Sequence, residues 1–229
     1  MLVSIVVPVY NEEKLLPDFV GEVVPYLKSN KFDYELIFIE NGSSDATLAI
    51  ATKFAKTNKN IKVFHLPQAG YGLALILGCK KARGEFVVIY NADFWDPKFI
   101  ELTKVNLLNY DIALGSKNLT GSIDQRPLGR KIVTKGFNLF LNILLGFRGT
   151  DTHGIKVFKR EFLLPVIRKC KTRTGIFDTE LIVRAQRGGA SILELPVEVI
   201  EKRPNRFGLI RILKTPADIL RLYFILGRS

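Results

Sequence analysis

The fold of this chain is decided by Phe86-Val87-Val88-Ile89-Tyr90-Asn91-Ala92-Asp93, where an apolar run passes directly into a polar, acidic end. The apolar and β-branched part, residues 86–89, predicts a strand buried in a parallel sheet. Open α/β sheets bind their ligands at the carboxyl ends of such strands. Asp93 is therefore predicted to lie at a binding site, where its carboxylate can meet a metal ion or the diphosphate that the ion neutralises.

Strands and helices alternate through the rest of the first half of the chain. Three apolar runs predict strands before residue 86: residues 3–9, 34–40 and 61–65. The segments between the predicted strands show helical spacing of apolar residues, and these helices are expected to end near residues 30, 57 and 82. This alternation predicts an α/β fold, in which a mostly parallel, Rossmann-like sheet with right-handed crossovers is flanked by helices.

The alternation becomes less regular after Asp93. The pattern predicts three further helices and three further strands, over residues 96–108, 130–145 and 177–186, and over residues 112–114, 155–158 and 192–200, respectively. The polar segment 118–129 contains Gly and Pro and is expected to be a mobile loop. No internal repeat, low-complexity tract or linker is apparent, so residues 1–229 are expected to form a single domain.

Charge and cysteine content narrow the partners and the compartment. The formal net charge of +12 favours an anionic partner, such as nucleic acid, an anionic membrane surface or a phosphorylated substrate. Nucleic acid is not expected, because no motif of a known reader is present. With Cys79 and Cys170 alone, no disulfide framework is expected. The first residues lack a secretory signal, and together these features predict a cytoplasmic protein.

The C-terminal segment combines a helix signal with an apolar run. Thr215-Pro216 is typical of a helix start, and residues 219–226 are apolar apart from Arg221. This run is too short to span a bilayer, which needs about 20 residues. Two interpretations remain open: an interfacial helix on an anionic membrane, or a terminal helix that packs on the sheet or on a second subunit.

Several polar segments follow one another in a fixed order along the chain. They are Val6-Val7-Pro8-Val9-Tyr10-Asn11-Glu12, Glu40-Asn41-Gly42-Ser43-Ser44-Asp45, Asn91-Ala92-Asp93, Gly115-Ser116-Lys117, Thr150-Asp151-Thr152-His153-Gly154, Phe177-Asp178-Thr179-Glu180 and Leu195-Pro196-Val197. In this order and spacing the chain resembles the family 2 glycosyltransferases, which have the GT-A fold. The resemblance extends over residues 2–215 and is closest to the dolichyl- or polyprenyl-phosphate sugar synthases.

The resemblance implies an inverting hexosyltransferase. Its donor would be a nucleotide-sugar of the GDP-mannose or UDP-glucose type, and its acceptor a polyprenyl or dolichyl phosphate at the cytoplasmic face of a membrane. Residues 1–117 would form the nucleotide-sugar half, residues 118–206 the acceptor half and residues 207–229 an amphipathic, membrane-associated tail. The implied donor-binding residues are Pro8, Tyr10, Glu12, Glu40, Gln68, Gly70, Asn91, Ala92 and Asp93.

The resemblance also implies the reacting groups. The implied catalytic residues are Asp93, Lys117, Arg130 and Asp178, and those for the acceptor phosphate are Lys117, Arg130, Thr134, Arg203 and Arg206. A lipid phosphate oxygen is already anionic and needs little help from a general base. Asp178 would then orient the sugar or a basic residue. With a hydroxyl acceptor, Asp178 and Glu180 would instead be the candidates for the base.

A divalent cation, Mg²⁺ or Mn²⁺, is implied as cofactor, with Asp93 and Asn91 as its protein ligands. The family usually has Asp where this chain has Asn91, and an amide oxygen brings no charge to the cation. Trp95 stands where a polar residue is common and cannot ligate. Lys117 replaces an expected Arg and lacks its bidentate fork. Cation binding is therefore predicted to be weak or dependent on bound nucleotide.

Two other functions remain open at this stage. One keeps the fold but transfers the sugar to a sugar hydroxyl, in polysaccharide or glycolipid assembly. The other is a catalytically weak partner that binds nucleotide or membrane, suggested by Asn91 and Trp95. The sequence also leaves open whether a separate membrane subunit or a homo-oligomer is needed.

Overall fold

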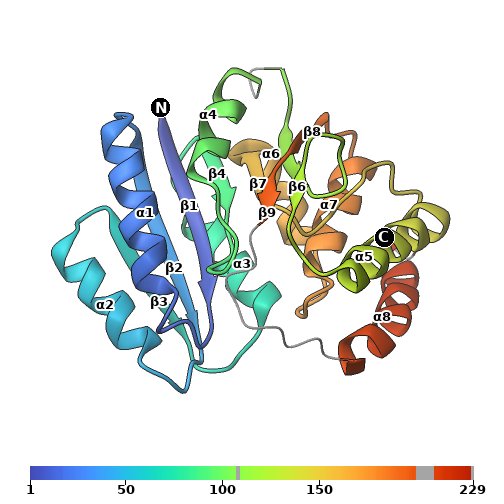
Figure 1. Ribbon diagram of the computed structural model, residues 1–229, viewed down its shortest axis with the longest axis horizontal. Helices are drawn as coiled ribbons and strands as arrows, with labels where there is room; N and C mark the ends of the chain where they lie inside the picture. The colour runs from blue at the N-terminus through green and yellow to red at the C-terminus, as the bar shows by residue number, and fades with distance from the viewer. Residues whose placement is uncertain (107–108, 200–208, 228–229) are drawn as a thin grey trace.

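The computed structural model describes residues 1–106, 109–199 and 209–227, with the side chains at 102–106, 130 and 209–216 outside the description. A large sheet is made of β1 (Leu2–Val9), β2 (Asp33–Asn41), β3 (Ile61–Leu66), β4 (Phe86–Ile89), β5 (Ile112–Ser116), β7 (Lys156–Lys159) and β8 (Ile192–Pro196). The helices around it are α1 (Leu16–Ser29), α2 (Thr47–Thr57), α3 (Tyr71–Lys81), α4 (Pro97–Asn106), α5 (Leu128–Leu145), α6 (Arg160–Lys169), α7 (Phe177–Arg187) and α8 (Leu209–Gly227) (Figure 1).

The strands of the large sheet lie in the order β3-β2-β1-β4-β7-β5-β8. Strand β7 runs antiparallel to both of its neighbours, while the other pairs are parallel. The predicted α/β fold class with a mostly parallel sheet is therefore confirmed. The carboxyl ends of β1, β2 and β4 meet at one edge, which is where the sequence predicts the ligand site.

Each face of the sheet is covered by its own apolar core. Alternate residues of β1 point to opposite faces, as the two-residue period of a strand requires. Val7 packs in the core that includes Phe19 of α1 and Phe99 of α4. Val6 packs in the core that includes Leu75 of α3 and Leu181 of α7. The sheet is therefore buried on both faces, which explains why its strands are continuous apolar runs.

The segment expected to be a mobile loop is in part a second, small sheet. Strand β6 (Ile123–Asp124) pairs in parallel with β9 (Glu198–Val199). The single strand expected over residues 192–200 is correspondingly divided into β8 and β9, and residue 200 lies outside the description. The sequence did not predict β6 or the division of the last strand, because strands of two residues are too short to show a periodic pattern.

Two helices differ from the sequence pattern. Helix α6 (Arg160–Lys169) was not predicted, and it contains Pro165 and four charged residues among its ten. Helix α8 begins at Leu209 rather than at Thr215, so that Pro216 lies inside the helix and not at its first turn. Among the described residues, no helix combines the length and the hydropathy needed to cross a bilayer.

Candidate active site

A cavity of about 630 Å³ opens at the carboxyl ends of the central strands. It is lined by residues from both halves of the chain, which meet only in the folded molecule. The sequence-predicted site residues that line it are Pro8, Tyr10, Glu12, Gly70, Asn91, Ala92, Asp93, Lys117 and Asp178. Their roles remain predictions, but the structure brings them to one place.

The turn after β1 directs Tyr10 and Glu12 to the cavity. Asn11 has a left-handed backbone (φ 54°), and its side-chain oxygen accepts a hydrogen bond of 2.9 Å from the Ser44 backbone N–H. The Glu12 backbone N–H donates to Thr47 Oγ1 at 2.7 Å. These bonds tie the turn to the start of α2 and leave the side chain of Glu12 on the cavity wall.

Glu40 and Gln68 do not line the cavity, although both were predicted to bind the donor. The carboxylate of Glu40 is buried, accepts the Ser43 backbone N–H at 2.6 Å and contacts His65 Nδ1. Gln68 is exposed on the loop before α3. The neighbouring Asn41 does line the cavity, and its Oδ1 accepts the Gly70 backbone N–H at 2.8 Å. Glu40 therefore shapes the β2 end, while Asn41 anchors the loop that borders the cavity.

The segment after β4 forms a tight turn that presents Asp93. The backbones of Asn91 and Phe94 exchange two hydrogen bonds, of 3.3 and 3.1 Å. Trp95 is buried beyond this turn, and its Nε1–H donates to Glu22 at 2.8 Å. Within the described part of the chain, no three His, Cys, Asp or Glu side chains are gathered closely enough to hold a metal ion. A cation at Asp93 and Asn91 would therefore need oxygen ligands from the substrate.

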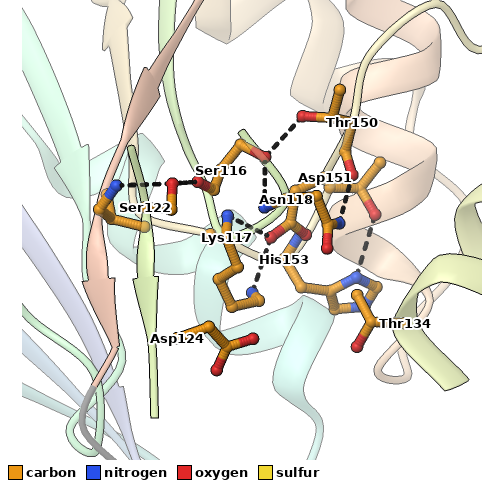
Figure 2. A network of polar contacts seen from close by, with 12 residues as sticks. Ser116, Lys117, Asn118, Ser122, Asp124, Thr134, Thr150, Asp151 and His153 are labelled. Carbon is orange, nitrogen blue, oxygen red and sulfur yellow. Dashed lines mark hydrogen bonds and ion pairs between the residues drawn. The ribbon is translucent and has the colours of Figure 1, made fainter. Parts of the chain in front are cut away.

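Lys117 and Asp151 form a buried ion pair at the cavity wall. Lys117 Nζ lies 2.8 Å from Asp151 Oδ2, and both side chains are less than a tenth exposed. Figure 2 shows Lys117 and Asp151 pointing toward each other, with Asn118 beside them. Burial favours the neutral form of Asp151, but the Lys117 ammonium outweighs this effect and lowers the pKa of Asp151 to about 2. Lys117 thus presents its ammonium to the cavity from a fixed position.

Close backbone contact brings the Asp151 segment to β5. A Cβ on Gly154 would lie 1.6 Å from the Gly115 carbonyl oxygen, so only glycine fits there. Glu194 of β8 holds the same segment by accepting the Thr150 backbone N–H at 2.7 Å. The backbone of β5 and the Glu194 side chain of β8 thereby place Asp151 beside Lys117.

Asp178 is bound from two sides at the start of α7. Lys156 Nζ lies 3.0 Å from Asp178 Oδ1, and the Tyr71 hydroxyl donates to Oδ2 at 2.7 Å. Lys156 and Asp178 are both almost completely buried. Glu180, two residues further on, points away and pairs with Arg184 at 2.8 Å. The structure therefore places Asp178, and not Glu180, at the cavity.

Sequence reasoning assigned no role to three further residues that line the cavity: Arg126, Arg173 and His153. His153 Nε2 faces the Gly175 carbonyl at 3.2 Å and its Nδ1 faces Thr152 Oγ1 at 3.0 Å. A carbonyl only accepts, so Nε2 carries the proton. Burial lowers the pKa of His153 below its usual range, which fits a neutral ring. His153 lies in one of the segments that carry the resemblance, whereas no short motif marks Arg126 or Arg173, which tertiary packing brings to the cavity.

Of the other residues predicted to bind the acceptor phosphate, Thr134 has a described side chain. Thr134 lies on α5, and Arg126 Nη1 donates to its Oγ1 at 3.4 Å. The side chain of Arg130 is outside the description, and Arg203 and Arg206 lie outside the described residues altogether.

The sequence is similar to known proteins over most of its length. Residues 4–126 match the model of the family described as glycosyl transferase family 2. Dolichyl-phosphate beta-glucosyltransferase ALG5A of Trichomonas vaginalis is 32% identical over 234 residues, which cover 96% of this chain and 72% of that protein. The chain belongs to glycosyl transferase family 2. It is therefore an enzyme, a hexosyltransferase, and the interpretation as a catalytically weak partner is set aside.

Two further comparisons place this family 2 glycosyltransferase among its relatives. Glycosyltransferase AglD of Haloferax volcanii is 31% identical over 230 residues, which cover 97% of this chain and 37% of that protein. Glucosyl-3-phosphoglycerate synthase from Mycobacterium tuberculosis, solved with Mn²⁺, uridine diphosphate and glucosyl-3-phosphoglycerate, superposes with a TM-score of 0.70 at 21% identity. That superposition covers 96% of this chain and 79% of the synthase, and it shows the shared GT-A fold.

Proposed function

We propose that this glycosyltransferase moves a hexose from a nucleotide diphosphate sugar to a polyprenyl or dolichyl phosphate, with inversion at the anomeric carbon. The observation that carries the proposal is the distribution of charge around one cavity. Glu12 and Asp93 line it on the donor side, whereas three cations, Lys117, Arg126 and Arg173, line it from residue 117 onward together with Asp178. Three cations on the acceptor side suit a phosphate better than a neutral sugar hydroxyl.

The surroundings of Asp178 also favour a phosphate acceptor. A hydroxyl acceptor needs a base to take its proton, while a phosphate oxygen attacks as an anion. Both oxygens of Asp178 already have partners, Lys156 and Tyr71. Taking up a proton would discharge the carboxylate and leave the buried Lys156 ammonium without its counter-ion. Asp178 is therefore assigned to position the site, with Lys117 and Arg126 holding the anionic nucleophile.

Asp93 and the Asn91 amide oxygen are the proposed protein ligands of a divalent cation. They supply one charge between them, so the donor diphosphate has to complete the coordination shell. Such an ion supplies neutralisation of the diphosphate leaving group. The Mn²⁺ present in the glucosyl-3-phosphoglycerate synthase structure supports a divalent cation in an enzyme of this fold.

The proposed acceptor is a membrane lipid, and α5 offers a surface suited to a bilayer. Apolar side chains are exposed along this helix at helical spacing: Leu128, Ile132, Leu139 and Ile143, the last 72% exposed. The opposite side of α5 is also apolar and packs in the core through Leu141. Because α5 follows directly on Arg126 and the acceptor side of the cavity, this exposed side would meet the membrane beside the site.

Helix α8 packs against α5 and repeats this arrangement (Figure 1). Its Leu222 is buried, while Leu220, Tyr223 and Phe224 are exposed. The sequence of α5 contains three basic and no acidic residues, and that of α8 contains three basic residues and one acid. Exposed apolar stripes with basic neighbours favour an anionic bilayer as the partner. We therefore assign this enzyme to the cytoplasmic surface of a membrane as a peripheral protein.

Transfer assays with defined substrates test the proposed reaction. Purified full-length protein is incubated with UDP-glucose, GDP-mannose or UDP-N-acetylglucosamine and with farnesyl phosphate, in Mn²⁺, Mg²⁺ or chelator. We expect a butanol-soluble, mild-acid-labile glycosyl phosphate with one donor, and its loss in chelator. Transfer to sugar hydroxyls but not to farnesyl phosphate, by folded protein, would overturn the proposed acceptor class.

A further inference from the structure

The Tyr71 hydroxyl lies between the two halves of the cavity. It donates to Asp178 Oδ2 at 2.7 Å and lies 3.3 Å from the side-chain oxygen position of Asn91. A phenol carries a single hydrogen. Hydrogen bonds to a carboxylate are shorter and stronger than those to an amide, so the hydrogen of Tyr71 is given to Asp178.

Asn91 can therefore meet Tyr71 favourably only as a donor. A rotation of the Asn91 amide by 180° exchanges its oxygen and its NH₂ group with almost no change in shape. With NH₂ toward Tyr71, each contact has one donor and one acceptor. The resulting series runs from the Asn91 amide to the Tyr71 hydroxyl, then to the Asp178 carboxylate, which Lys156 holds at 3.0 Å.

We propose that Tyr71 is a positioning residue that ties the turn of Asn91 to Asp178, and that this tie requires Asn rather than Asp at position 91. The Tyr71 hydroxyl has one hydrogen, which it donates to Asp178. A carboxylate at position 91 has no hydrogen to donate, so its oxygen would face the Tyr71 oxygen without a hydrogen bond. It would also bring a second negative charge near the first. The amide avoids both penalties and leaves its own oxygen available to the cavity.

The backbone on both sides of Tyr71 is fixed, so that its hydroxyl has a defined position. On one side, the Gly70 N–H is held by Asn41. On the other, the Gly72 N–H donates to the Arg173 carbonyl at 3.1 Å. A Cβ on Gly72 would lie 2.8 Å from Phe177 Cδ2, so glycine allows α3 to approach the start of α7. This approach is what brings Tyr71 within reach of Asp178.

The tie changes the interpretation of Asn91. If Asn91 were simply a metal ligand that had lost its charge, Asn91→Asp would improve cation binding at no cost to the protein. If Tyr71 requires an amide there, the same substitution costs stability before any cation is present. The cation-binding part of this inference rests on the proposed function, whereas the hydrogen-bond part does not.

Four proteins test the tie by thermal unfolding in chelator: wild type, Asn91→Asp, Tyr71→Phe and the double variant. Both changes are nearly isosteric, and circular dichroism verifies folding. We expect Asn91→Asp alone to lower Tm by on the order of 5 °C, and by clearly less in the Tyr71→Phe background. Direct repulsion between the new carboxylate and Asp178 is present in both backgrounds, so the difference reports on the hydroxyl. An equal loss of Tm in both backgrounds, or a smaller loss with Tyr71 intact, would overturn the inference.

Electron paramagnetic resonance with Mn²⁺ in the presence of uridine diphosphate then tests the positioning role, because the diphosphate is needed to complete the proposed cation site. Tyr71 is not a ligand, yet its hydroxyl orients one, so Tyr71→Phe should weaken Mn²⁺ binding by about tenfold. Tyr34→Phe, which removes a hydroxyl near the start of β2 and outside the cavity, is the control and should leave Mn²⁺ binding unchanged. Tighter Mn²⁺ binding by Asn91→Asp with an unchanged Tm would contradict the inference. If no protein bound Mn²⁺, the proposed cation would be lost, while the four melting temperatures would still decide whether the tie exists.

Discussion

The Arg126 side chain is held in place by Asp124 and still has N–H groups that can bind a ligand in the cavity. Its Nε and Nη2 donate to the two oxygens of Asp124, at 2.9 and 2.7 Å. A guanidinium has five N–H donors, so others remain to face the cavity. Because a hydrogen bond to a charged group contributes ~1.5–3 kcal/mol, Arg126→Ala should raise the KM for farnesyl phosphate by at least about tenfold. Steady-state kinetics should show little change in the donor KM.

Lys131→Ala is the matched control for this prediction, because it removes a cation from the first turns of α5 that does not line the cavity. An equal rise in KM for both variants would show that general charge, and not the position of Arg126, attracts the acceptor.

The contrast between Arg126 and Lys117 shows which site residues can be predicted from the sequence. Lys117 ends an apolar strand and was predicted, whereas Arg126 reaches the cavity only because β6 pairs with β9.

At the scale of elements, the seating of α3 against α7 depends on Gly72. An added methyl group would contact Phe177 Cδ2 at 2.8 Å and Arg173 Cα at 2.9 Å, and backbone must move to accept it. Gly72→Ala should therefore destabilise the protein by about 1–3 kcal/mol, lowering Tm by several degrees, and should reduce transfer activity. Gly21→Ala in α1, where nothing lies within 4 Å, should instead raise Tm slightly. A Gly72→Ala protein as stable and as active as wild type would contradict this account.

The elements also show where prediction from sequence succeeds. Strands β1, β2 and β4 are buried on both faces, so each is a continuous apolar run followed by polar site residues, and the donor side of the cavity was predicted from them. Helix α6 was missed because Pro165 and its charged residues conceal the helical pattern. The start of α8 was misplaced because Thr215-Pro216 is typical of a helix start, whereas the helix begins at Leu209 and continues through these two residues. Such cases are decided by tertiary packing and not by local preference.

At the scale of the whole molecule, the net charge and the exposed apolar residues favour the same partner. The charge of +12 attracts the protein to an anionic surface over distances up to about a Debye length. The net charge does not determine which face of the protein meets that surface. The exposed residues Ile132 and Ile143 of α5 supply that orientation, because burying each would contribute about 1.5–3 kcal/mol. Together they predict that the protein approaches a membrane through charge and is retained there through α5 and α8.

Vesicle sedimentation tests this arrangement with Ile132→Gln/Ile143→Gln. Wild type should sediment with vesicles of phosphatidylglycerol and phosphatidylcholine, and less so at high salt. The double variant should bind at least about tenfold more weakly, because its apolar contribution is lost. Leu48→Gln, which changes an exposed leucine on α2, is the control and should bind as wild type. Transfer to water-soluble farnesyl phosphate should be unchanged in both variants, because the cavity is untouched. Unaltered vesicle binding by the double variant would refute the proposed surface, and conversion of a wild-type dimer to a monomer would assign α5 to a subunit interface instead.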